Sequence, residues 1–385
     1  MKFQLRLLTA AAVVAVAVSA PRALALVSLE DGRDHVYVDG TVEMGYDSNL
    51  FANSQNSGTM TYEGTLSTEF ARRAGWIGVN ATASLNWARY GNFRSQDYVD
   101  PKLSAELTKQ TGRTTGSLTV SAAKQDHTDL TINTRDTSWD YDAGLNVQYP
   151  VIERYSITGS FDFNKVDYTD AEIFTNQTVY AGNLYLYYIL NDQRDLFIDA
   201  RDRYTSEENN THDIDKAISA GVSGRVYGPF NGSVQVGYQT RNSFGGIDNG
   251  ATYQDVTASG TTTWNINRRI TLTGDLSRDY STTALAQSLE STRAGLTAQD
   301  SFTARASGTL SGSIGENRFI GVEGELEPEG KHREDEFVSA TASYFYTFNQ
   351  HLKVSINYTY YRSFSNVGFA EFGRNQVFFT ASSHW

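Results

Sequence analysis

A strict alternation of apolar and polar residues is the feature that most limits what this chain can fold into. It is clearest in SWDYDAGLNVQY, from Ser138 to Tyr149, where every odd-numbered residue is apolar or aromatic and the others are polar or glycine. Successive side chains of a β-strand point to opposite faces, so this period of two predicts a strand with one apolar and one polar face. Similar patterns recur over 36–46, 77–87, 155–163, 218–226 and 256–264. The sequence therefore predicts an all-β protein.

The connections between these strands alternate between short and long. The long ones are rich in Asn, Asp, Ser, Thr and Gly, which favour turns and hydration. This rhythm predicts an up-and-down antiparallel meander of about 18 strands, with about 16 as the alternative. The longest outer connection that we draw, 47–59, is modest, so we expect no long constriction loop folded into the interior.

One region leaves the strand boundaries open. In residues 291–312 the apolar residues stay at even-numbered positions, that is, they keep one parity, for longer than one strand usually lasts. A long connection precedes this segment and we expect a short turn at 315–318, so the rhythm predicts that it crosses once. A hairpin hidden within it is the alternative. The strand count is least certain over 291–327.

The N-terminus predicts export. Lys2 and Arg6 precede the apolar run 7–18, and 23–25 forms a small-x-small cleavage site. This pattern is typical of a secretory signal peptide. We therefore expect residues 1–25 to be removed and residues 26–385 to form a single domain. The sequence contains no Cys, so disulfides and metal-thiolate sites are excluded as sources of stability.

Strands with these two faces could form a soluble sandwich or a membrane barrel. Large aromatic residues near strand ends favour the barrel, because such residues gather at both membrane interfaces. The expected girdle residues are Trp139, Tyr149, Tyr155, Trp264 and Trp385. In lipid each unpaired backbone group costs roughly several kcal/mol, so the sheet has to close on itself. We predict a closed antiparallel transmembrane β-barrel in the outer membrane of a Gram-negative bacterium, with both termini in the periplasm and with lipid and lipopolysaccharide around it.

Several short motifs resemble one family. The junction from Met44 to Phe51, the stretch 291–296 and the stretch 356–360 are similar to motifs of the second of the outer-membrane β-barrel porin families. The tail QVFFTASSHW also resembles the C-terminal signal by which the barrel-assembly machinery recognises such proteins, although Ser383 stands where a large apolar residue is more usual. The family resemblance implies a pore, or the surface exit of an exopolysaccharide secretion pathway working with polysaccharide-export proteins. It implies no catalytic residues.

If the apolar parity faces lipid, charged residues of the other parity line the lumen. The candidates for pairing or for ion selectivity are Asp140, Asp142, Asp162, Arg201, Arg203, Arg225, Glu323, Glu325 and Glu327. We expect the three arginines to pair with nearby acids. The three glutamates have no basic partner on their own strand, and they are the best candidates for a field that favours cations or neutral sugars.

Two further groups have a local and a functional interpretation. Trp76, Tyr90, Tyr185 and Tyr187 would suit a sugar path if they faced inward, but we favour a girdle position for them. In the first motif, Asp47 and Asn49 are expected to bond their own backbone and start a turn, with Leu50 and Phe51 packed under it. The charged run 331–336 is interpreted as a solvated loop tip.

Other classes of function have little support. The net charge of −12 at pH 7 argues against nucleic-acid binding. His127 and His212 lie in or beside acidic outer segments, but no GxSxG or HExxH motif accompanies them. We therefore expect no enzymatic activity, cofactor or metal. The competing hypothesis is a structural or adhesive surface barrel with a filled lumen and functional external loops.

Overall fold

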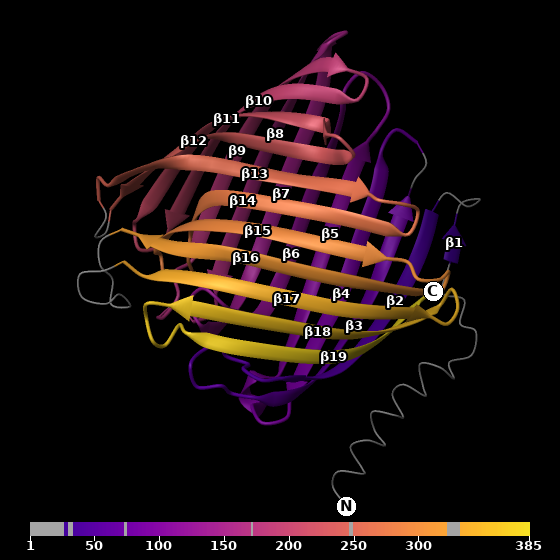
Figure 1. Ribbon diagram of the computed structural model, residues 1–385, viewed down its shortest axis with the longest axis vertical. Helices are drawn as coiled ribbons and strands as arrows, with labels where there is room; N and C mark the ends of the chain where they lie inside the picture. Colours follow the sequence, from indigo (N-terminus) through magenta and orange to yellow (C-terminus); the bar gives the residue numbers. More distant parts are fainter. Residues whose placement is uncertain (1–26, 30–33, 73–74, 171, 246–248, 322–331) are drawn as a thin grey trace, which may run out of the picture.

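A computed structural model describes residues 27–29, 34–72, 75–170, 172–245, 249–321 and 332–385. The predicted signal peptide, residues 1–25, lies outside this range. Over the described residues, 18 long strands form a single antiparallel sheet in which each strand pairs with the next along the chain. The sheet closes on itself where β19 pairs with β2, for example Val377 with Tyr46. The prediction of a closed up-and-down barrel of 18 strands is confirmed (Figure 1).

The strands are between 12 and 19 residues long, which is enough to cross a bilayer when they are tilted. Their bounds are β2 (Asp34–Asp47), β3 (Thr59–Arg72), β4 (Gly78–Tyr90), β5 (Tyr98–Lys109), β6 (Thr115–Asp129), β7 (Thr134–Ile152), β8 (Tyr155–Tyr168), β9 (Gln177–Asn191), β10 (Arg194–Glu207), β11 (His212–Tyr227), β12 (Phe230–Phe244), β13 (Thr252–Asn265), β14 (Ile270–Thr282), β15 (Ser288–Asp300), β16 (Ala306–Ile320), β17 (Glu334–Thr347), β18 (Leu352–Ser365) and β19 (Phe372–His384). A short strand, β1 (Val27–Leu29), pairs with the start of β2, and a 3-10 turn, η2 (Arg94–Gln96), lies before β5. No helix in the described part of the chain is long and apolar enough to cross a membrane.

The two ends of the barrel differ in their connections. At one end lie tight turns, such as the two residues between β7 and β8 and the two between β11 and β12. The longer connections, such as 48–58 between β2 and β3, lie at the other end. The C-terminus lies at the short-turn end, where Val38 and Trp385 exchange two backbone hydrogen bonds of 3.1 Å.

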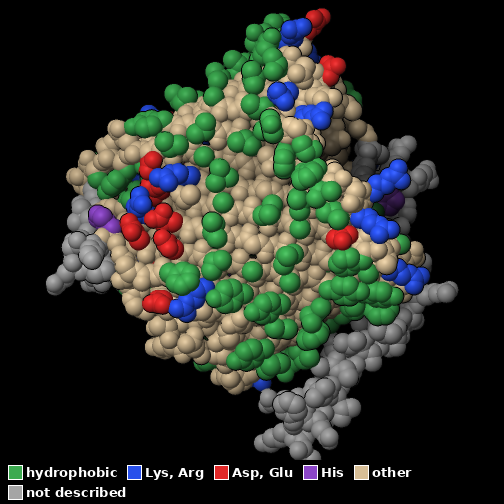
Figure 2. Space-filling view, viewed as in Figure 1, with side chains coloured by type: hydrophobic (Ala, Val, Ile, Leu, Met, Phe, Trp, Pro, Cys, Tyr) green, Lys and Arg blue, Asp and Glu red, His purple; other side chains and the backbone are tan. Residues whose placement is uncertain are grey.

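Polarity is inverted relative to a soluble protein. Large apolar side chains on the outer wall are exposed, as in Leu184 at 57% and Ile218 at 71%, whereas the inward-facing Asp215 and Arg241 are 0% exposed. Figure 2 shows apolar side chains spread over the middle of one outer face, with charged side chains gathered toward the ends. Directly paired residues share a face, and the alternation stays consistent around the whole ring, as in Tyr141 opposite Ala122 and Val377 opposite Tyr46. The barrel therefore needs an apolar solvent outside it.

The strand boundaries within 288–320 differ from the sequence prediction. The segment does not cross once. It forms the hairpin β15–β16, with its turn at 301–305, and the predicted turn at 315–318 lies inside β16. The cause is the register, which pairs Leu296 with Gly312 and Ala294 with Ile314, all even-numbered. The outward-facing residues are therefore even-numbered in both strands of the hairpin. For this reason the alternation in the sequence could not distinguish a hairpin from one long strand. The total of 18 is unaffected because the predicted second turn is absent.

Candidate functional site

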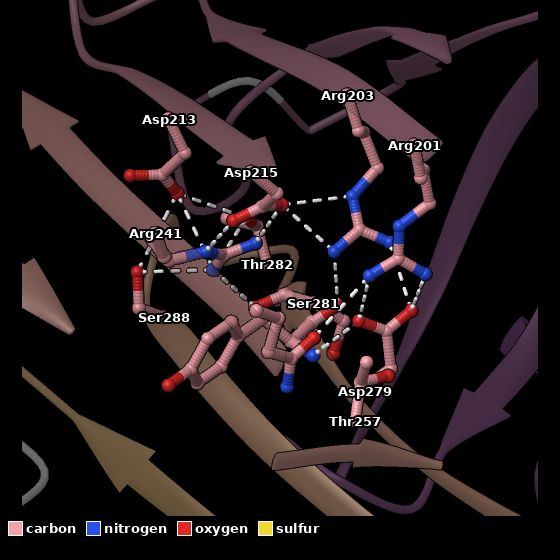
Figure 3. Close-up of polar contacts among 12 residues, drawn as sticks. Arg201, Arg203, Asp213, Asp215, Arg241, Thr257, Asp279, Ser281, Thr282 and Ser288 are labelled. Carbon is pink, nitrogen blue, oxygen red and sulfur yellow. Dashed lines mark hydrogen bonds and ion pairs between the residues drawn. The ribbon is translucent and has the colours of Figure 1, made fainter. Parts of the chain in front are cut away.

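The inner wall holds a network of three arginines and three aspartates near the long-connection end (Figure 3). The members are Arg201 and Arg203 on β10, Asp213 and Asp215 on β11, Arg241 on β12 and Asp279 on β14. They meet because the register places Arg203 opposite Asp215, and Asp215 opposite Arg241, on three adjacent strands with the same inward parity. The network thus connects four of five consecutive strands from inside the barrel.

Arg241 is the centre of this network and is fully buried. Its guanidinium donates to both carboxylate oxygens of Asp215, at 2.7 and 2.9 Å, and to the Ser281 carbonyl at 2.7 Å. Such bidentate, charge-assisted hydrogen bonds are the strong ones in proteins. Arg241 therefore holds β11, β12 and β14 together on the lumen side.

The predicted arginines have different partners. Arg201 donates to both oxygens of Asp279 at 2.6 Å, and Arg203 donates to Asp215 at 2.8 Å. The expected pairing with acids is therefore found for these two. Arg225 differs, because it lies exposed beside the β11–β12 turn and donates to the Gly228 carbonyl and to the Gln193 amide oxygen. The expected ion pair of Arg225 was wrong, since the β11–β12 turn and the neighbouring β9–β10 turn supply neutral acceptors within reach of its long side chain.

The predicted acids are divided between described and undescribed parts. Asp140 accepts from Gln125 and Ser138, and Asp142 accepts from Ser121 and Asn164. Both carboxylates lie on the inward face, because the alternating residues Trp139 and Tyr141 lie on the outer wall. Asp162 has the same parity, opposite Gly144. Glu323, Glu325 and Glu327 lie outside the described residues.

The connections at the long end contact one another across the opening. Ile132, Phe174 and Ala284 form one buried cluster, although they come from the β6–β7, β8–β9 and β14–β15 connections. The β14–β15 connection lies across the ring from the β6–β7 connection. Thr175 N–H donates to the Ala284 carbonyl at 2.9 Å, and the Asn133 amide donates to the Ala52 carbonyl at 2.8 Å. Several connections thus together bridge this end of the barrel.

Arg333 joins these connections. It is 1% exposed and donates to the Thr131 carbonyl at 2.7 Å and to the Asn133 side chain at 2.8 Å. Its guanidinium also lies 4.4 Å from the ring of Phe319 and 5.3 Å from that of Phe369. For this residue the prediction of a solvated loop tip was wrong. A run of charges signals exposure only statistically, and the local sequence does not show which partners arrive from distant connections.

The first motif behaves as its local interpretation predicts. Asn49 N–H donates to the Asp47 carboxylate at 2.9 Å, and Leu50 is buried against Ala88 and Tyr90. The Asp47 carboxylate also forms an ion pair with Arg374 of β19, with 2.6 Å between Oδ2 and Nη2. The motif therefore starts the β2–β3 connection and also ties the strands at which the barrel closes.

Aromatic side chains occur on both faces of the wall. Trp139, Tyr149 and Tyr155 are exposed on the outer face, whereas Trp264 is half-buried against Phe230 and Trp385 stacks on His351 at 4.3 Å. Trp139 lies toward the long-connection end and the other four toward the short-turn end.

Three of the four uncertain aromatics face inward. Tyr185 pairs with Asp199 and Tyr187 with Phe197, both of inward parity, and Tyr90 is buried. A girdle position was therefore the wrong choice for these three. Trp76 is 83% exposed in the β3–β4 turn. Strand parity already indicated the inward face, and proximity to strand ends was the misleading signal.

The two histidines considered for catalysis have structural neighbours. His127 pairs with Asp136 at 3.0 Å, and His212 stacks on Phe244 at 4.9 Å. No group of three or more His, Asp or Glu side chains that could hold a metal occurs in the described part of the chain.

Comparison with known proteins agrees with this architecture. Residues 215–383 match the model of the family described as Putative beta-barrel porin 2. This match confirms the family that the motifs predicted. A comparison with curated protein sequences finds no match. The description of the matched family agrees with the closed barrel fold.

Solved structures resemble the fold at low sequence identity. OpdO of Pseudomonas aeruginosa aligns with a TM-score of 0.50 and 11% identity, over 91% of this chain and 97% of that chain. OccK2 (OpdF) of Pseudomonas aeruginosa, solved in complex with glucuronate, aligns with a TM-score of 0.50 and 9% identity, over 91% and 98%. At these identities the likeness shows the fold alone.

Proposed function

We propose that this protein is a passive conduit across the outer membrane, with both termini and the short turns in the periplasm. The observation that carries the proposal is the closed ring with a polar inner wall and an apolar outer wall. A polar interior stabilises water and polar solutes, while the outer wall faces lipid and lipopolysaccharide. Residues 1–25 would be the cleaved signal peptide, and the strand ending at Trp385 would be recognised by the barrel-assembly machinery.

Single-channel recording tests the proposal directly. Purified protein added to a planar lipid bilayer is expected to produce discrete current steps. Heat-unfolded protein from the same preparation is the control, and it should produce none. A folded protein that inserts, as shown by protease protection in vesicles, but carries no current would refute the conduit. A chain that stays monomeric and folded in buffer without detergent would refute membrane insertion itself.

We also propose a finer role, the outer-membrane step of exopolysaccharide secretion alongside polysaccharide-export proteins. Its support is the inward position of Tyr185, Tyr187 and Phe197, since rings on a lumen wall can stack against sugar rings. Deleting the gene and measuring polymer at the cell surface tests this role. Normal surface polymer in the deletion strain would leave general diffusion as the function.

The second candidate is a structural or adhesive barrel whose lumen stays closed. It is favoured by the connections that bridge the long end, above all by the Ile132, Phe174 and Ala284 cluster. The two candidates differ in the bilayer experiment, because a permanently bridged barrel would insert without conducting.

A further inference from the structure

A cavity of about 750 Å³ lies against the inner wall beneath the ion network. Tyr185, Tyr187 and Phe197 form one side of it, and Ser233, Gln235 and Thr261 are among the residues of the other. The lining as a whole comes from the consecutive strands β9 to β14, and these six residues share the inward face. The volume falls within the range of about 300–1,000 Å³ that is usual for small-molecule sites.

The aromatic side is a continuous surface, which we call the aromatic shelf and define as Tyr185, Tyr187 and Phe197. The two tyrosine rings are nearly parallel, with centroids 6.0 Å apart, and the Phe197 ring lies 5.2 Å from Tyr187. Phe197 is 4% exposed and packs closely on Gly221, where a Cβ atom would collide with its ring. Phe197 therefore supports the two tyrosines from beside them, and the half-buried rings of Tyr185 and Tyr187 are the part of the shelf that a ligand in the lumen can reach.

The opposite side offers hydrogen-bonding groups without charge. Its side chains include the hydroxyls of Ser223, Ser233, Ser259 and Thr261 and the amide of Gln235. The one charged residue among the described residues of the lining is Asp275, and no Lys or Arg lines the cavity. Such a wall suits a ligand that carries many hydroxyl groups and no charge.

One unpartnered polar atom belongs to a residue next to the shelf. Asp199, opposite Tyr185 in the register, is 5% exposed, and its Oδ1 has no hydrogen-bond partner among the described residues. Buried polar atoms are nearly always satisfied, so this oxygen can accept a hydrogen bond from a water or from a ligand hydroxyl.

We propose that the aromatic shelf binds a neutral sugar ring as it passes through the barrel. The C–H face of a sugar ring would lie on Tyr185 and Tyr187, and its hydroxyls would bond to the Ser, Thr and Gln side chains opposite. A sugar carboxylate would meet the carboxylate of Asp275 in a cavity that no described Lys or Arg lines, so the site disfavours anionic sugars. The proposal rests on the conduit function and names its substrate class.

Equilibrium binding in detergent tests the site without any current. The probe is maltohexaose, titrated by isothermal calorimetry, with a galacturonic acid hexamer as the matched anionic probe. Wild-type protein is expected to bind the neutral hexamer and to bind the anionic hexamer at least about tenfold more weakly. Tyr187→Ala should weaken maltohexaose binding about two- to tenfold, as expected for one lost ring contact.

Matched variants separate the site from folding. Tyr188→Ala alters the neighbouring ring, which pairs with Tyr155 on the outer face, and it should leave the affinity unchanged. Tyr187→Phe keeps the ring and should retain binding within about twofold. Equal affinity of wild type and Tyr187→Ala for maltohexaose would overturn the proposal. Stronger binding of a charged sugar than of maltohexaose, either the anionic hexamer or a cationic chitosan hexamer, would also overturn it. Conduction without sugar binding would refute this site and leave the conduit intact, whereas sugar binding without conduction would refute the conduit alone.

Discussion

Replacing Arg241 with Met should destabilise the folded barrel strongly while preserving side-chain volume. The change removes a fully buried cation that donates to both oxygens of Asp215 and to the Ser281 carbonyl. The substitution leaves the buried carboxylates of Asp213 and Asp215 without this cation. Removing one partner of a buried ion pair costs about 3–5 kcal/mol, because the remaining charge stays buried.

The surviving contacts place the expected loss at the lower end of that range. Asp215 keeps Arg203, whose Nη2 lies 2.7 Å away, and Asp213 keeps the Ser243 hydroxyl at 2.6 Å. Both carboxylates therefore remain partly compensated. We expect Arg241→Met to lower the free energy of unfolding by about 3 kcal/mol.

Guanidinium-induced unfolding in lipid vesicles, followed by tryptophan fluorescence, measures this quantity. Arg225→Met is the matched control, because that exposed guanidinium contacts only neutral acceptors, and it should cost about 1 kcal/mol or less. Adding Asp215→Asn to Arg241→Met should recover part of the loss, since the incompletely compensated charge of Asp215 is then removed while Arg203 keeps its contact with Asp279. If Arg241→Met and Arg225→Met cost the same, the network is hydrated and the reasoning fails.

Three other changes test separate parts of the barrel. Leu184→Arg, at a position 57% exposed on the outer wall, should destabilise the protein in vesicles by about 2–4 kcal/mol, whereas Asn146→Arg on the inner face, opposite the neutral Ser117 and Ser160, should cost much less; equal losses would contradict the assignment of faces. Arg333→Met should raise single-channel conductance by releasing the bridging connections. The control is Arg362→Met, at a half-buried arginine that pairs with Glu371 at the same end; identical conductance of the two variants would show that Arg333 does not restrict the opening. Changing Glu323, Glu325 and Glu327 together to Gln should reduce cation preference, measured as reversal potential in a salt gradient; an unchanged value would put these carboxylates outside the permeation path.

The alternation of residue types determined most of the fold. In Ser138–Tyr149 it assigned Trp139, Leu145 and Tyr149 to one face and Asp140 and Asp142 to the other, and the structure keeps that assignment around the closed ring. This succeeded because the side-chain period of a strand is fixed by backbone geometry and requires no distant partner. Strand number followed from the same pattern and from the rhythm of the connections.

The tertiary structure alone decided where side chains meet along the barrel axis. Parity could not place the β15–β16 turn, because the register preserves parity through it. Nor could it show that Arg203, Asp215 and Arg241 lie level on three strands, or that Arg333 reaches Asn133 from 200 residues away. Those contacts depend on the stagger between strands and on closure of the ring, which are properties of the whole sheet and not of any local segment.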